Sequence, residues 1–386
     1  YVSAADILFL ILFAYGYIYI LTENGTLSQM IQVLIRRLGD RTHLLIPVCM
    51  LVFGILGSTM GIFEEVYGLI PVFGGIAVGL GYDVMLGGAI VYVGVATGFA
   101  AATTNPFSVG IAESIAQLPA MSGLGYRIFC FVIFQTVSII YVMWYGARIK
   151  AHPEKSVMYG VATDTPPMPE ISGDGMSLRQ KLSLLLFAAT IGMLLYGTTR
   201  LGWYIDEIAA LFLMMMIITG IVGGYSATEI CKSFIRSTQS MVSSVLVIGF
   251  TRGILLVMQD AQISDTVVYY LSQLLDGSSK SLSAVGMLVI QNIINFFITG
   301  SSSQATITMP IMAPVADLVG LSRQTAVLAY IFGDGFSDLF WPTACILGCG
   351  LMGVPVNKWY RFITPLFVMM AVLQTILTAA SVWVYG

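Results

Sequence analysis

The chain has 386 residues, of which 57% are hydrophobic and only 10% are charged, and its formal net charge is −3. A soluble globular domain usually carries about 25% charged residues, so this composition excludes an ordinary soluble protein. The mean hydropathy of +0.89 and several apolar runs long enough to cross a bilayer indicate an all-α polytopic membrane protein. No basic cluster calls for a nucleic-acid partner.

The first half of the chain consists of apolar spans separated by short polar or glycine-rich links. These spans cover residues of about 3–22, 43–58, 61–80, 84–103 and 127–147. An amphipathic stretch at 25–38 follows the first span, and a short helix at 108–117 precedes the last. The Gly-rich fourth span stops at Thr103-Thr104-Asn105-Pro106, because proline cannot continue a helix through its interior.

The second half begins after the one clearly aqueous region, residues 148–181, which carries several Lys and Arg residues and a proline-rich stretch. Its apolar spans lie at about 182–199, 205–224, 241–258, 281–299, 323–340 and 361–384. Amphipathic links at 227–239 and 261–276 flank the third of these spans. A Ser-rich break and a proline-containing helix follow the span at 281–299, as they follow the span at 43–58 in the first half.

Lys and Arg residues in short loops predict the orientation, because cytoplasmic loops of membrane proteins are enriched in both. The basic residues at 36–41 and at 148–181 each predict a cytoplasmic location, and the even number of spans between them makes the two assignments agree. By the same count, spans of the first half run in the opposite direction to their counterparts in the second half.

The two halves also share the order of their elements. Aligning Pro71 with Pro310 places Gly81 on Gly320 without a gap. Similar elements in opposite orientation are the inverted-topology repeats of secondary transporters, which bind substrate near the membrane midplane. Chance similarity in a chain rich in Gly and Ser is the alternative.

The repeat predicts three parts of the chain: a first repeat at 1–147, a cytoplasmic linker at 148–181 and a second repeat at 182–386. Two spans of the second repeat have no counterpart in the first. We therefore expect one or two further helices before residue 1.

Two polar stretches interrupt apolar sequence at corresponding places, Gly57–Glu65 and Gly300–Pro310. Backbone without helical hydrogen bonds is tolerated at membrane depth only inside protein or beside a wet cavity, so we interpret both as broken helices around a site. Glu64 and Glu65 are functional candidates because carboxylates within a membrane are costly. Alternatively, this pair marks a helix N-terminus near the membrane surface.

Hydroxyl, amide and carboxylate oxygens gather at these breaks and at the two proline breaks. Hard cations prefer several oxygen ligands, and half-helix N-termini receive anionic groups. The candidate Na⁺ or H⁺ sites use Ser58, Thr104, Asn105, Ser302, Thr306 and Asp334. The candidate substrate contacts are Ser58, Thr59, Glu65, Asn105, Arg252, Ser301, Ser302, Ser303 and Thr343. Close helix packing uses the same small residues and is the alternative.

Three charged residues in or near apolar spans could belong to the site. Asp334 and Asp338 are four residues apart, which predicts one helix face and either a cation or proton site or a pair of near-surface charges. Arg252 lies in mid-span and could pair with a substrate carboxylate or with one of the acids.

An enzyme is not expected. The sequence has no HExxH motif and no GxSxG elbow. Cys345 and Cys349 are four apart, but no further Cys or nearby His completes a metal set. We expect no cofactor other than Na⁺.

Several motifs in combination resemble one known family. They are Gly61-Ile-Phe-Glu-Glu65, Gly81-Tyr-Asp83, Asn105-Pro-Phe107, Gly253-Ile-Leu-Leu256, Ser301-Ser-Ser-Gln-Ala305 with Met309-Pro310, and Phe332-Gly-Asp-Gly-Phe-Ser337. Over essentially its whole length the chain resembles the YfcC family, which is related to basic amino-acid antiporters and anaerobic C4-dicarboxylate carriers in the ion-transporter superfamily.

The resemblance implies paired re-entrant hairpins, a scaffold that forms a homodimer, and a transport domain that moves as an elevator. It also implies that Ser58, Thr59, Asn105, Ser301, Ser302 and Thr343 line ion and substrate sites. The expected protein is a multi-pass secondary transporter in the lipid bilayer of the bacterial inner membrane. Its solute is a small carboxylate, either an amino acid such as arginine or ornithine or a C4-dicarboxylate. Coupling is to the monovalent cations Na⁺ or H⁺, or by exchange, and an ion channel is the alternative.

Overall fold

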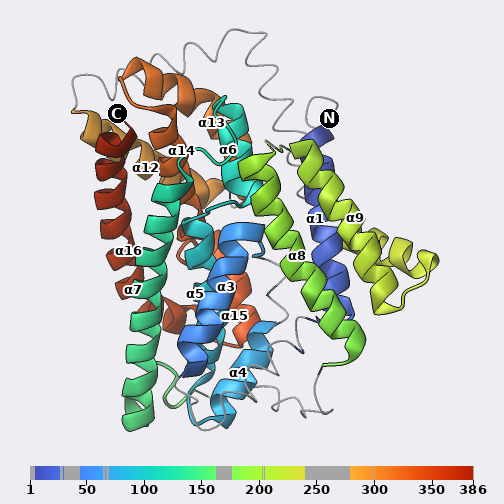
Figure 1. Cartoon of the computed structure of the whole chain (residues 1–386). Helices are drawn as coiled ribbons and strands as arrows, with labels where there is room; N and C mark the ends of the chain where they lie inside the picture. The colour runs from blue at the N-terminus through green and yellow to red at the C-terminus, as the bar shows by residue number, and fades with distance from the viewer. Residues whose placement is uncertain are drawn as a thin grey trace. The chain divides into compact units, whose positions relative to one another are not determined.

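The computed structural model describes residues 5–26, 29, 44–63, 66, 69–161, 176–201, 203, 205–239, 279–298 and 300–385. Within these ranges every regular element is a helix, which confirms the predicted all-α class (Figure 1). Three of the described helices are long and apolar enough to cross a membrane: Leu124–Ala151, Asp206–Gly223 and Val356–Tyr385. Glu64, Glu65 and Arg252 lie outside the described residues.

The chain divides into two compact units that are interleaved in sequence. Unit 1 comprises Tyr1–Gly39, Pro119–Met121 and Ile171–Ile263, and unit 2 comprises Asp40–Leu118, Ser122–Glu170 and Ser264–Gly386. Unit 1 contains α1 (Ala5–Glu23), α8 (Leu178–Arg200), α9 (Ile205–Gly223) and a helix at 227–239. Helix α9 packs against both α1 and α8, and Tyr17 and Thr190 share a buried hydrogen bond of 3.0 Å between α1 and α8.

Unit 2 holds the remaining described helices in two successive sets with the same order. The first set is α3 (Leu45–Met60), α4 (Ile70–Gly79), α5 (Val84–Ala100), a π-helical turn (Pro106–Gly110) with α6 (Ile111–Ile115), and α7 (Leu124–Ala151). The second set is α12 (Lys280–Phe297), α13 (Ser301–Leu318), α14 (Arg323–Gly335), α15 (Pro342–Met352) and α16 (Val356–Tyr385). Two short 3-10 turns, Pro153–Lys155 and Ser337–Leu339, follow α7 and α14.

The third helix of each set forms the core of unit 2. Helix α5 is buried along its whole length, as is α14 from Gln324 to Gly335. Helix α5 packs against α3, α4 and α7, and α14 packs against α12, α13 and α16. A helix buried on all sides needs apolar residues on all sides, which explains the lack of an amphipathic pattern in α5.

The turns that lead into these two core helices have the same local structure. Gly81 and Gly320 adopt left-handed φ values of +81° and +71° at the ends of α4 and α13. The next N–H donates to a carbonyl five residues back in each turn, from Tyr82 to Ala77 (2.9 Å) and from Leu321 to Ala316 (2.8 Å). This pattern caps the preceding helix and favours glycine at the left-handed position.

Three element boundaries differ from the prediction. Helix α3 continues to Met60, and α4 begins only at Ile70, so the first break is longer than expected. Helix α14 ends at Gly335, and Asp338 lies in the following 3-10 turn. The prediction that Asp334 and Asp338 share one helix face is therefore wrong, because the helix ends between them. Helix α15 was not predicted.

Close backbone contact between α3 and α5 generates a stability prediction. A Cβ atom at Gly98 would lie 1.9 Å from the carbonyl oxygen of Gly54, whereas one at Gly192 in α8 would meet nothing within 4 Å. We expect Gly98→Ala to lower the free energy of unfolding by about 1–3 kcal/mol, as overpacking does. Gly192→Ala serves as the matched control and is expected to leave stability unchanged or to raise it. Thermal melting of purified protein measures both, and equal melting temperatures would contradict this close contact.

Candidate functional site

The end of α3 is joined to the residues that follow α5 by backbone hydrogen bonds. Gly61 ends α3 in a left-handed conformation with φ +68°. The carbonyl oxygen of Ser58 accepts hydrogen bonds from the N–H groups of Thr103 (2.9 Å), Thr104 (3.2 Å) and Asn105 (3.1 Å). The last carbonyls of a helix lack partners within it. Here the N–H groups of three residues beyond α5 are the partners of one such carbonyl.

Side chains complete this α3–α5 junction, which comprises residues 57–61 and 101–105. The Ser58 hydroxyl donates to the carbonyl of Ala101 (3.0 Å), and it is hydrogen-bonded to the Thr103 hydroxyl (2.9 Å). Thr104 donates from its hydroxyl to the carbonyl of Thr59 (3.1 Å). The junction therefore gathers hydroxyl and carbonyl oxygens within a buried part of unit 2.

Asn105 connects the junction to the π-helical turn that follows. Its side-chain oxygen accepts the N–H of Phe107 (2.8 Å), and its side-chain nitrogen donates to the carbonyl of Gly57 (3.4 Å). A Cβ atom at Gly61 would lie 2.3 Å from the Asn105 side-chain oxygen. Position 61 therefore requires glycine both for its backbone conformation and for the space that Asn105 occupies.

The second break lies between α12 and α13 and is held by Asp334 from α14. The Ser301 hydroxyl donates to one carboxylate oxygen of Asp334, and the Asn295 side chain donates to the other (3.0 Å). Tyr330 donates from its hydroxyl to the carbonyl of Ser301 (2.7 Å). Asp334 is only 1% exposed. A buried carboxylate without such donors would be strongly destabilised.

A chain of buried amides extends from Asn295 along α12 and α13. Asn295 donates to the side-chain oxygen of Gln304 (3.1 Å), and Gln304 donates to the side-chain oxygen of Gln291 (2.9 Å). Gln291 in turn donates to the Thr308 hydroxyl (2.9 Å). Such networks orient their members strongly when nearly all the groups are satisfied. The side-chain oxygen of Asn295 is a buried acceptor without a partner in the described part of the chain.

The second break is in contact with the π-helical turn that follows the α3–α5 junction. The Ser302 hydroxyl at the start of α13 donates to the carbonyl of Phe107 in the π-helical turn (2.9 Å). The ends of the two core helices also touch, since a Cβ atom at Gly335 would lie 2.5 Å from the backbone nitrogen of Ala100. Two segments about 200 residues apart in sequence therefore form one polar region inside unit 2.

The structure brings many of the sequence-predicted residues together in this region. Ser58, Thr104 and Asn105 belong to the α3–α5 junction, and Ser301, Ser302 and Asp334 belong to the second break. Ser303 is buried in the first turn of α13.

Other predicted residues take a different place or lie outside the description. The hydroxyls of Thr59 and Thr306 donate within their own helices, to the carbonyls of Ile55 (2.6 Å) and Ser302 (2.7 Å). Thr343 is the second residue of α15. Glu65 and Arg252 are outside the described residues.

One buried ion pair beside the α3–α5 junction was not predicted. Arg127 of α7 donates to the carboxylate of Glu113 (2.8 Å), and the two side chains are 1% and 2% exposed. The guanidinium group also donates to the carbonyl of Thr103 from two nitrogens, at 3.1 and 3.3 Å. Arg127 therefore positions the backbone of the junction. An acid in a short apolar helix followed by Arg in the next span is the sequence signal that could have revealed it.

The oxygen-bearing groups at the two breaks suit a small cation or a polar solute better than a transition metal. Among the described residues, no group of three His, Cys, Asp or Glu side chains could hold a metal ion. The described residues of the two breaks instead offer hydroxyls, amides and the buried carboxylate of Asp334. Oxygen ligands of this kind are those that hard cations prefer.

The ion pair between Arg127 and Glu113 generates a second prediction. Arg127→Gln leaves a buried carboxylate without its partner, so we expect a loss of about 3–5 kcal/mol in the free energy of unfolding. Glu113→Gln leaves the opposite charge unpaired and is expected to cost a similar amount. The double variant removes both charges and should lose less than the sum of the single losses. Chemical denaturation measures all three, and strictly additive losses would contradict a coupled pair.

Comparisons with known proteins agree on one class. A family model described as the C4-dicarboxylate anaerobic carrier, DcuC, matches residues 1–383. The protein of Escherichia coli K12 named "Putative basic amino acid antiporter YfcC" is 32% identical over 381 residues, which cover 94% of this chain and 74% of that protein. An uncharacterized protein of Haemophilus influenzae is 30% identical over 392 residues, covering 100% of this chain and 77% of its own.

Two solved transporter structures have a similar fold. The YdaH transporter of Alcanivorax borkumensis has a TM-score of 0.74 at 16% identity, covering 96% of this chain and 84% of its own. MtrF of Neisseria gonorrhoeae, described with a class of antimetabolite efflux pumps, has a TM-score of 0.71 at 17% identity, covering 100% and 84%. At these identities the likeness concerns the fold.

The family model and the named relative define a membrane transport protein, and three of the described helices are apolar enough to cross a membrane. The chain belongs to the DcuC family of C4-dicarboxylate anaerobic carriers. The resemblance to the YfcC family noted in the sequence is confirmed.

Proposed function

We propose that the protein is a secondary active transporter of a small solute bearing a carboxylate group. The observation that carries the proposal is the contact inside unit 2 between the second break and the interrupted helix after α5, where Ser302 donates to the carbonyl of Phe107 (2.9 Å). Broken helices of secondary transporters place freed backbone groups and half-helix N-termini at the substrate and ion sites.

Two kinds of group in this polar region suit different parts of such a solute. Helix α13 begins at Ser301 without a side-chain cap, and the N–H groups of a helix N-terminus favour an anionic group. Asp334 and the carbonyl and hydroxyl oxygens of the α3–α5 junction favour a cation. A carboxylate at the N-terminus of α13 and Na⁺, H⁺ or a substrate amino group beside Asp334 and the junction oxygens would satisfy both kinds of group.

The substrate class rests on the relatives. The family model is named for C4-dicarboxylates, and the name of the Escherichia coli relative refers to basic amino acids. Both kinds of solute carry a carboxylate. Arginine or ornithine and a C4-dicarboxylate are therefore the substrates to test, with coupling to Na⁺ or H⁺ or by exchange.

The proposal includes the arrangement expected from the sequence. Residues 1–147 and 182–386 would be inverted-topology repeats joined by a cytoplasmic linker at 148–181. The identical turns at Gly81 and Gly320 support this equivalence. Unit 2 would be the transport domain and unit 1 the scaffold of a homodimer, in a multi-pass protein of the bacterial inner membrane that works as an elevator.

Counterflow in proteoliposomes tests the proposed function. Vesicles loaded with unlabelled arginine, ornithine or a C4-dicarboxylate are placed in trace labelled solute, with and without gradients of Na⁺ or H⁺. A transporter accumulates label transiently against its concentration when the unlabelled solute is inside. A channel shows no such stimulation, and that outcome would overturn the proposal in favour of the channel.

Loss of the Ser302 hydroxyl generates the third prediction. Ser302→Ala removes the hydrogen bond between the breaks, and we expect uptake to fall by roughly fivefold or more, because such a bond contributes about 1 kcal/mol. Thr364→Val is the matched control, since its exposed hydroxyl bonds only within α16, to the carbonyl of Tyr360. Initial uptake rates at equal protein per vesicle measure both. Normal uptake by Ser302→Ala would place the site elsewhere.

The same assay tests the sequence prediction for Glu65. Glu65→Gln keeps the size of the side chain and removes its charge, so a role in cation or substrate binding predicts lower uptake. Unchanged uptake would remove Glu65 from the proposed site.

A further inference from the structure

A cavity lies in unit 2, lined by residues outside the helix breaks. It has a volume of about 420 Å³ and lies among the C-terminal turns of α7, the 153–157 loop and the N-terminal part of α16. Its lining includes Tyr141, Trp144, Arg148, Glu154, Lys155 and Arg361. None of these residues belongs to the site described above.

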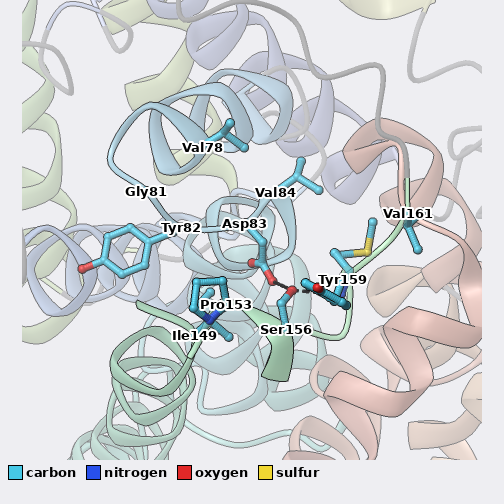
Figure 2. Close-up of a pocket in the computed structure, with 11 residues that line it drawn as sticks. Val78, Gly81, Tyr82, Asp83, Val84, Ile149, Pro153, Ser156, Tyr159 and Val161 are labelled. Atoms are coloured by element: carbon cyan, nitrogen blue, oxygen red, sulfur yellow. Dashed lines mark hydrogen bonds between the residues drawn. The ribbon is translucent and has the colours of Figure 1, made fainter. Parts of the chain in front are cut away.

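The loop that forms one wall of this cavity is held in place by Asp83, the N-cap residue of α5. The Asp83 carboxylate accepts hydrogen bonds from the hydroxyls of Tyr145 (2.6 Å) and Ser156 (2.5 Å). Figure 2 shows Asp83 and Ser156 facing each other in the adjacent cavity of about 260 Å³. The N–H of Val157 donates to the Tyr145 hydroxyl (3.2 Å). Lys155 is therefore carried by an ordered loop.

The opposite walls are two membrane-length helices that contact each other beneath the cavity. Helices α7 and α16 lie side by side (Figure 1). The Tyr141 hydroxyl donates to the carbonyl of Phe362, and the rings of Tyr145 and Phe362 meet edge to face at 4.9 Å. This contact fixes Arg148 at the end of α7 near Arg361 at the start of α16.

The charge of the cavity is positive. Arg148, Lys155 and Arg361 contribute three cations, and Glu154 contributes one carboxylate. Arg148 also lies over the ring of Trp144, 5.3 Å from its centroid. Glu154 is hydrogen-bonded to the ring nitrogen of His152 (3.1 Å). The lining therefore favours an anionic group.

An exposed apolar stripe leads away from the cavity along α16. Pro365 lines the cavity, and Val368, Val372 and Ile376 follow at intervals of three or four residues, so all four lie on one helix face. These last three side chains are 54%, 54% and 56% exposed. On a membrane-length helix such a stripe faces acyl chains, and the cavity lies where those chains would meet the headgroup region.

We propose that this cavity binds the phosphate headgroup of an anionic phospholipid, whose acyl chains lie along the exposed stripe of α16. Basic pockets between membrane helices recognise anionic headgroups in this way. The apolar stripe selects a lipid over a free phosphate ion, because a soluble anion would leave it unused. Trp144, half exposed at the rim, suits the boundary between headgroups and acyl chains.

Native mass spectrometry of the full chain tests the proposal. Protein in detergent is titrated with phosphatidylglycerol, with phosphatidylcholine of the same acyl chains, and with inorganic phosphate. The test variant is Arg148→Gln with Arg361→Gln. Lys181→Gln with Arg200→Gln is the matched control, because both residues are exposed cations at the two ends of α8 and equal the test variant in lost charge.

We expect phosphatidylglycerol to bind in preference to phosphatidylcholine. The test variant should bind phosphatidylglycerol about 30-fold more weakly, because each of the two basic residues strengthens anionic-lipid binding by roughly fivefold. The control variant should bind like the unaltered protein. Equal loss in both variants, or no loss in either, would overturn the proposal. Displacement of the lipid by inorganic phosphate at a similar concentration would overturn the choice of a lipid.

Discussion

The structure depends on satisfying the backbone groups that two broken helices leave inside an apolar protein. Each unpaired N–H or carbonyl would cost several kcal/mol at membrane depth, by a rough estimate. At the first break, the Ser58 carbonyl is hydrogen-bonded to three consecutive N–H groups that follow α5, so groups from both helix ends are paired. This convergence forces α3 to end beside the end of α5, and Gly61 allows the chain to turn away without displacing Asn105.

The two breaks are supported by different chemistry although the helices around them occur in the same order. The first relies on backbone carbonyls and short hydroxyls, with Arg127 and Glu113 behind it. The second relies on the carboxylate of Asp334 and the amide of Asn295. Equivalent positions in the two halves therefore present unlike groups.

The sequence predicted the features that depend on local chemistry. Glycine and proline breaks, the polar stretches beside them and the matching turns at Gly81 and Gly320 could be identified from residue type and spacing. The features that it did not predict depend on tertiary contacts. The amides of Gln291 and Gln304 look like ordinary interruptions of apolar helices until α12 and α13 are packed together. The end of the helix between Asp334 and Asp338 did have a local signal, because Gly335 lies between them and glycine is common at helix ends.

The contact between Gly335 and Ala100 has a consequence for motion. No side chain atom fits between the ends of α5 and α14, so neither helix can slide past the other without separating the breaks that they carry. Any movement of α5 against α14 would have to break and remake the buried hydrogen bonds of both breaks at once. For the proposed transporter, alternating exposure of a solute to the two faces of the membrane would therefore be easier with α5 and α14 moving as a single rigid block.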